Sequence, residues 1–110
     1  MSEQIDVNEI LARIQETARE HGVNLTYTNC SVYLKLLDYA EENSNIVTQY
    51  VDAIRINITT MGLAKYIGSI SPRIITDSLK KFSECGIIKY TVNKPNPSTV
   101  VLYRRFFEDQ

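Results

Sequence analysis

Apolar residues in the first part of the chain recur at the spacing of an amphipathic helix. Four of them follow one another at intervals of four, three and four residues: Val7, Leu11, Ile14 and Ala18. Asp6 and Glu9 have the spacing of a capping box, and Gly22 can supply a left-handed C-terminal cap. The pattern therefore predicts a helix over Val7–His21.

The apolar stripe of this helix is narrow, which is typical of a two-helix seam. The stripe can dock on the chain's own core, or it can pair with the same helix of a second subunit. The narrow width favours a homodimer, with four contact residues: Val7, Leu11, Ile14 and Ala18. Residues 1–30 would then be a helix and connection that serve as a dimerisation arm.

A second helix is predicted over Val32–Asn43, after a connection at residues 23–30. Either Asn29 or Ser31 can cap it, since short polar side chains are favoured at that position. Apolar side chains cover more than half of the helix surface, which indicates a central, buried helix.

The stretch that follows is ambiguous. Residues 46–54 have helical spacing, whereas three isoleucines alternate with polar residues as in a strand: Ile54, Ile56 and Ile58. We expect a short helix over Val47–Ala53, followed by a short strand over Arg55–Ile58.

Two further helices are predicted between residues 59 and 86. Thr60 can cap a short helix that ends at Gly68, and Ser71 and Pro72 are the favoured residues for the start of the next one. Its apolar face has helical spacing: Ile75, Leu79 and Phe82. Gly86 ends this helix.

A β-hairpin is predicted next. Residues 87–92 are rich in β-branched and aromatic side chains, as is the stretch Val100–Phe106. The segment between them, residues 93–99, contains Pro95 and Pro97, which cannot donate to a sheet ladder, so it is a loop. The predicted fold class is therefore α+β, mostly α.

The net charge of -1 conceals an uneven distribution. Residues 1–54 hold three basic and nine acidic side chains, whereas residues 55–105 hold nine basic and two acidic side chains, a net charge of +7. Such asymmetry points to a polyanion-binding half and an acidic half with another role. A solvated charge distribution without function is the alternative.

Catalytic and metal chemistry find no support in the sequence. One histidine, His21, and two distant cysteines, Cys30 and Cys85, make neither a zinc pattern nor a disulfide framework. The cysteines are expected to be buried small apolar groups, and His21 a helix C-terminal residue. No nucleophile–base pair, phosphate loop, signal peptide or membrane span is recognisable, so we expect a cytoplasmic, non-enzymatic protein without cofactor, metal or small-molecule ligand.

The stretch of residues 31–106 resembles the winged helix-turn-helix family. Thr60–Gly68 (TMGLAKYIG) is similar to the family's first helix of the pair, and Ser71–Phe82 (SPRIITDSLKKF) to its recognition helix. Ser83–Ile88 (SECGII) is similar to its helix-to-strand junction. MarR- and ArsR-like regulators and the winged domains of plasmid and phage replication initiators share these features. The chain would thus be a winged domain over residues 31–106, with an N-terminal helical extension and a tail at 107–110.

The resemblance implies that the helix over residues 72–85 enters the major groove of double-stranded DNA, with the wing at 93–99 on the backbone or minor groove. Arg73 would read guanine, Asp77 a cytosine amine and Ile74 a thymine methyl. Thr76 would touch base or phosphate. The residues expected on phosphates or in the wing are Ser69, Ser71, Lys80, Lys81, Lys94 and Arg104.

These expectations amount to a sequence-specific DNA-binding protein, a dimeric transcriptional regulator. A second hypothesis belongs to another class, since winged helices also bind proteins. It is an interaction module in a replication, partition or anti-defence assembly. Ile74 as a core residue, and Asp77 as an ion-pair partner of Lys80 or Lys81, are the structural alternatives at the site.

Overall fold

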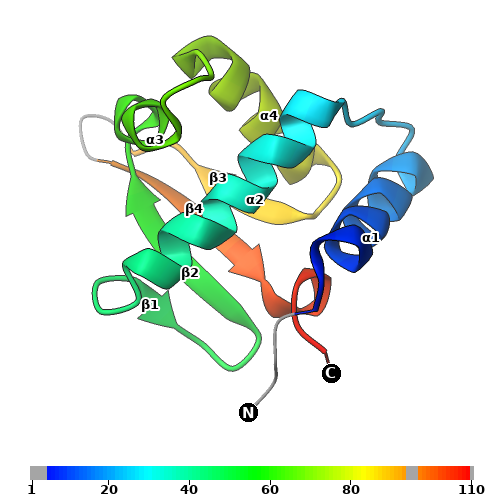
Figure 1. The fold of residues 1–110 in the computed structure, drawn as a ribbon, viewed down its shortest axis with the longest axis horizontal. Coiled ribbons are helices and arrows are strands. Elements are labelled where there is room, and N and C mark those ends of the chain that lie inside the picture. The colour runs from blue at the N-terminus through cyan, green and yellow to red at the C-terminus, as the bar shows by residue number, and fades with distance from the viewer. Residues whose placement is uncertain (1–4, 94–96, 110) are drawn as a thin grey trace.

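Four α-helices and one antiparallel sheet of four strands make up the part of the chain that the computed structural model describes, residues 5–93 and 97–109 (Figure 1). The helices are α1 (Val7–Glu20), α2 (Tyr27–Glu42), α3 (Thr60–Ile67) and α4 (Pro72–Glu84). The strands are β1 (Thr48–Gln49), β2 (Ala53–Ile58), β3 (Ile88–Thr91) and β4 (Ser98–Tyr103), and a 3-10 turn, η1, covers Arg104–Phe106. The α+β class is confirmed.

Side-chain caps fix where the helices begin. Asp6 accepts a hydrogen bond from the Glu9 amide at the start of α1, and Ser71 accepts one from the Ile74 amide at the start of α4, with Pro72 as the first helical residue. Gly68 ends α3 in the left-handed conformation, with φ of 81°. The predicted bounds of α1 and α4 are thus confirmed to within two residues.

The prediction for α2 was wrong at its start. Thr26 and Asn29 form a capping box, in which each side chain binds the backbone amide of the other residue. The helix therefore begins five residues before the predicted Val32. The predicted helix over Val47–Ala53 was also wrong, because Thr48 and Gln49 pair with Arg55 and Ile54 in a tight antiparallel hairpin.

The sheet has the strand order β1-β2-β4-β3, and α2 crosses one face of it (Figure 1). Ile56 of β2 pairs with Val100 of β4, and Ile88 of β3 pairs with Leu102. These four residues are buried, and with helix residues such as Leu36 they form one hydrophobic cluster. No helix in the described ranges is long and apolar enough to cross a membrane.

The N-terminal helix belongs to this same cluster. Ile10, Ile14 and Ala18 are at most 1% exposed, whereas Val7 is 49% exposed. Ile14 and Ala18 are covered by their own protomer, so they cannot also form the predicted seam with a second subunit. Leu11 packs against the cluster from its edge. The buried face of α1 therefore includes Ile10 and excludes Val7, unlike the predicted stripe. The homodimer stays a prediction.

The C-terminal segment is also part of the fold and not a free tail. Phe106 and Phe107 are 4% and 3% exposed and belong to the core. The Ile5 amide donates to the Phe107 carbonyl oxygen at 3.1 Å. The two ends of the described chain therefore lie side by side.

Candidate nucleic-acid interface

Helix α4 presents a charged ridge to solvent. Its buried face consists of Ile75, Ser78, Leu79 and Phe82. The exposed ridge, at intervals of four, three and four residues, consists of Arg73, Asp77, Lys80 and Glu84. Neither of the two ion pairs in the described residues involves the ridge, so Asp77 is not paired with Lys80 or Lys81 there. The charges along the ridge therefore alternate between positive and negative. Glu84 is a member of the ridge that the sequence did not lead us to expect.

A hollow opens between α4, the start of α3 and the β3–β4 hairpin. It is lined by Thr59, Thr60, Thr76, Lys80, Tyr90, Val92 and Ser98. Residues that bear hydroxyl groups therefore line it from three elements, and Lys80, which is exposed, adds a cationic side chain. Hydroxyls and ammonium groups are the donors that proteins commonly use on phosphate oxygens.

The capping groups of α3 hold one side of this hollow in place. The Thr59 hydroxyl accepts a 2.8 Å hydrogen bond from the Gly62 amide. A Cβ on Gly62 would lie 2.9 Å from that same hydroxyl oxygen, so glycine is needed for this close cap. Thr76 on α4 donates its hydroxyl to the Pro72 carbonyl at 3.0 Å.

A second hollow lies beside the α3–α4 turn. It is lined by Tyr27, Thr28, Ser31, Lys35, Ile67, Ser69, Ile70 and Ile74. Tyr27 is 88% exposed and Ile74 is 42% exposed. Ile74 is thus a surface residue and not a core residue. Tyr27 and Thr28 were missed by the sequence reasoning, which placed them in a connection; the Thr26–Asn29 spacing was the available signal.

The predicted contact residues lie at different places. Arg73, Ile74, Asp77 and Lys80 are exposed on α4, and Ser69 and Ser71 are exposed in the turn before it. Ser71 uses its oxygen to accept from the Ile74 amide at 3.3 Å. Lys94 lies outside the described residues.

Lys81 turns back toward the N-terminus of α2. Its ammonium group donates to the side-chain oxygen of Asn29 at 3.3 Å and to the Asn24 carbonyl at 3.5 Å. Asn29 also donates to the buried Ser78 hydroxyl at 2.7 Å. Lys81 is therefore partly committed to a polar network that joins α2 to α4.

The prediction that the second strand of the hairpin extends to Phe106 and carries Arg104 was wrong, since β4 ends at Tyr103. Arg104 lies in η1, directly after the last residue of β4. The six-residue strand spans about 17 Å, so Arg104 is that far from Ser98 at the other end of β4. Its guanidinium pairs with Glu108 at 2.6 Å and donates to the Tyr50 carbonyl at 2.9 Å. All three of its nitrogens are engaged, because the third one donates to Gln49. Arg104 holds the C-terminal segment to the β1–β2 hairpin.

The positive charge of residues 55–105 is spread over several surfaces. Three of the cations are on α4: Arg73, Lys80 and Lys81. Arg55 and Lys89 alternate with core residues along β2 and β3, so they point to the face of the sheet that is turned away from the core. Charge counted along the sequence therefore did not define a single binding surface.

Neither cysteine has the properties of a reactive thiol. Cys30 and Cys85 are free and buried, as predicted. Burial raises the pKa of both thiols; a hydrogen bond from Gln15 partly opposes this at Cys30, and the charge of Glu84 adds to it at Cys85. His21 follows α1 as its C-terminal cap, with Nδ1 2.9 Å from the Thr17 carbonyl oxygen.

Comparison with known proteins gives no relative: no protein-family model, no curated protein and no solved structure matches this chain.

Proposed function

We propose that the protein is a winged helix-turn-helix protein that binds double-stranded DNA through the exposed ridge of α4. The element order α2, β2, α3, α4, β3, β4 is the one that the resemblance leads us to expect, with α1 and β1 added. The observation that carries the proposal is the hollow between α4, the start of α3 and the β3–β4 hairpin, which Lys80 lines together with Thr59, Thr60 and Ser98.

In this proposal α4 lies in the major groove. Arg73, at the exposed N-terminal end, reads a guanine, since its planar group can donate twice to the O6 and N7 acceptors. Lys80 and the hydroxyls of Thr59 and Ser98 hold the backbone beside it. We propose transcriptional regulation as the biological role, with a homodimer formed through surfaces other than Ile14 and Ala18.

The test is a titration of fluorescently labelled duplex DNA selected from a random-sequence pool. Binding should weaken with salt with a logarithmic slope of about -0.9 per phosphate contacted. Lys80→Ala should reduce that slope by about one and weaken all sequences alike. Arg73→Ala should cost about 1–3 kcal/mol and relax preference at one base position.

Arg19→Ala is the matched control, because Arg19 is exposed on α1. It should leave both the slope and the base preference unchanged. Absence of duplex binding at low salt would overturn the proposal.

A protein partner is the second candidate, and one observation favours it. The α4 ridge carries both signs of charge, and the exposed side chains of Tyr27 and Ile74 line the hollow beside the turn that precedes α4. A protein partner at this surface would depend on Tyr27 and Ile74, so their replacement by serine would abolish binding. The binding would be much less sensitive to salt than binding to duplex DNA.

A further inference from the structure

One face of the sheet is left open by the helices. Figure 1 shows α2 crossing the other face. The outward positions alternate with core residues along the strands. Ala53 is buried, and the others keep part of their surface exposed: Thr48, Arg55, Asn57, Lys89, Thr91, Thr99, Val101 and Tyr103. Two of these side chains are cationic, and none is a carboxylate.

The strand register gathers the cations around a small apolar centre. Arg55 of β2 and Lys89 of β3 both pair with Val101 of β4, one from each side. Their Cα atoms are two strand spacings apart, about 10 Å. Tyr103 lies two residues further along β4 on the same face.

Two tyrosine rings on this face have arginines beside them. The Arg105 guanidinium lies 5.3 Å from the centre of the Tyr103 ring and 4.8 Å from that of Phe106, and it donates to the Gly86 carbonyl at 3.5 Å. The Arg55 guanidinium lies 5.9 Å from the centre of the Tyr50 ring. Tyr50 is 45% exposed. Asp52 lies nearby in sequence, in the turn between β1 and β2, and is the one acid in that hairpin.

Cations beside aromatic rings suit an unpaired nucleic-acid strand, because the cations attract phosphates while bases stack on the rings. Duplex DNA fits this face less well. Four strands at their usual spacing are about 15 Å wide, whereas the major groove is about 12 Å wide and accepts one helix or a two-stranded ribbon.

We propose that this open sheet face binds single-stranded nucleic acid, with Arg55, Lys89 and Arg105 on the phosphates and with Tyr50 and Tyr103 against the bases. This site is on the opposite side of the sheet from the core that carries α4. It does not depend on duplex binding by α4, so either site can fail without the other.

The test is an anisotropy titration of labelled oligothymidine and of a labelled duplex with two double variants. Lys89→Gln with Arg105→Gln removes two exposed cations from the open face; Arg73→Gln with Lys80→Gln removes two from α4. The first variant should weaken oligothymidine binding at least tenfold and leave duplex binding unchanged. The second should leave oligothymidine binding unchanged.

Tyr103→Leu should also weaken oligothymidine binding, because it keeps an apolar side chain but removes the ring. Arg19→Gln is the control for loss of charge, and equal unfolding midpoints exclude a folding defect. The proposal is overturned if the wild type does not bind oligothymidine at low salt, or if both double variants weaken it equally. It is also overturned if sedimentation shows self-association that Lys89→Gln abolishes, since the face would then bind a second copy.

Discussion

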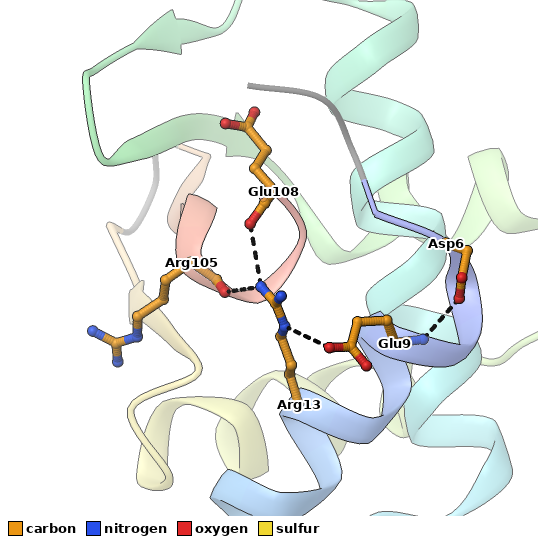
Figure 2. A network of polar contacts seen from close by, with 5 residues as sticks. All are labelled: Asp6, Glu9, Arg13, Arg105 and Glu108. Carbon is orange, nitrogen blue, oxygen red and sulfur yellow. Dashed lines mark hydrogen bonds and ion pairs between the residues drawn. The ribbon is translucent and has the colours of Figure 1, made fainter. Parts of the chain in front are cut away.

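The guanidinium of Arg13 in α1 donates a 2.8 Å hydrogen bond to the carbonyl oxygen of Arg105, 92 residues later in the chain (Figure 2). The same nitrogen donates to the Glu108 carbonyl at 3.2 Å. Glu9 pairs with Arg13 from the preceding turn of α1 at 3.4 Å. One side chain thus joins the N-terminal helix to the C-terminal segment.

Arg13→Ala should destabilise the protein by about 1–3 kcal/mol, because two carbonyl groups lose a charged donor. The measurement is the free energy of unfolding in urea. Arg19→Ala, on the exposed side of the same helix, should change it by less than about 0.5 kcal/mol. Equal effects of the two substitutions would show that Arg13 does not fasten the helix.

The Asn29–Ser78 hydrogen bond should be an energetic link between α2 and α4. Both side chains are buried, at 5% and 0% exposure. Asn29→Ala should cost about 2–3 kcal/mol, since it removes the acceptor of the Thr26 amide in the capping box and leaves Ser78 without its donor. Ser78→Ala should cost less, because it removes a single hydroxyl.

A double-mutant cycle on the two residues measures the coupling directly. We expect a coupling energy of about 0.5–3 kcal/mol, the range for residues in contact. Additive effects would mean that the hydrogen bond contributes no net stability.

Tyr66 should contribute to the free energy of unfolding, and this contribution should be lost at alkaline pH. Its hydroxyl donates to the Glu42 carboxylate, and this bond, followed by burial and by the charges of Glu42 and Asp38, raises the pKa of Tyr66 to about 12. A tyrosine pKa in an unfolded chain is about 10. The folded state therefore favours the protonated hydroxyl, and the stabilisation is fully present below pH 10 and is lost as the pH rises toward 12.

The comparison of wild type with Tyr66→Phe across this range isolates the effect, because other groups titrate in both proteins. The difference in unfolding midpoint should be constant up to about pH 10 and should shrink above it. A difference that stays the same at pH 12 would contradict the assigned cause.

A side chain at position 68 should destabilise the protein only because the backbone there is left-handed, and not because of a steric clash. Its φ is 81°, and a Cβ there would meet nothing within 4 Å. Gly68→Ala should therefore cost about 1–2 kcal/mol through the left-handed conformation, measured by thermal unfolding. Gly68→Asn should cost less, since asparagine tolerates this conformation better. A neutral Gly68→Ala would mean that the α3–α4 turn adapts.

Local signals in the sequence were enough for some elements. The start of α4 was predicted because Ser71 and Pro72 combine a cap with a preferred first residue, and α1 because Asp6 and Glu9 frame it. The start of α2 was missed because its capping box uses Asn29 in place of the usual Glu or Gln. Residues 46–54 have helical spacing, but pairing with β2 overrides it.

The candidate site was predictable only as far as the helix period reaches. The helical periodicity correctly predicted that Arg73 and Lys80 are exposed. It did not show that Lys81 turns toward Asn29, or that Arg104 reaches the Tyr50 carbonyl and the Gln49 side chain. Those contacts depend on elements that are distant in sequence, and no local pattern encodes them.

The contact between Arg13 and residues 105–108 also sets an order of events during synthesis. The ribosome releases α1 early and its carbonyl partners about 90 residues later. Until then α1 cannot complete its packing, and Ile10 and Ile14 lack part of their cover. The nascent chain therefore carries an unfinished apolar helix until residues 105–108 have been made, and chaperones that recognise such segments have that interval in which to act.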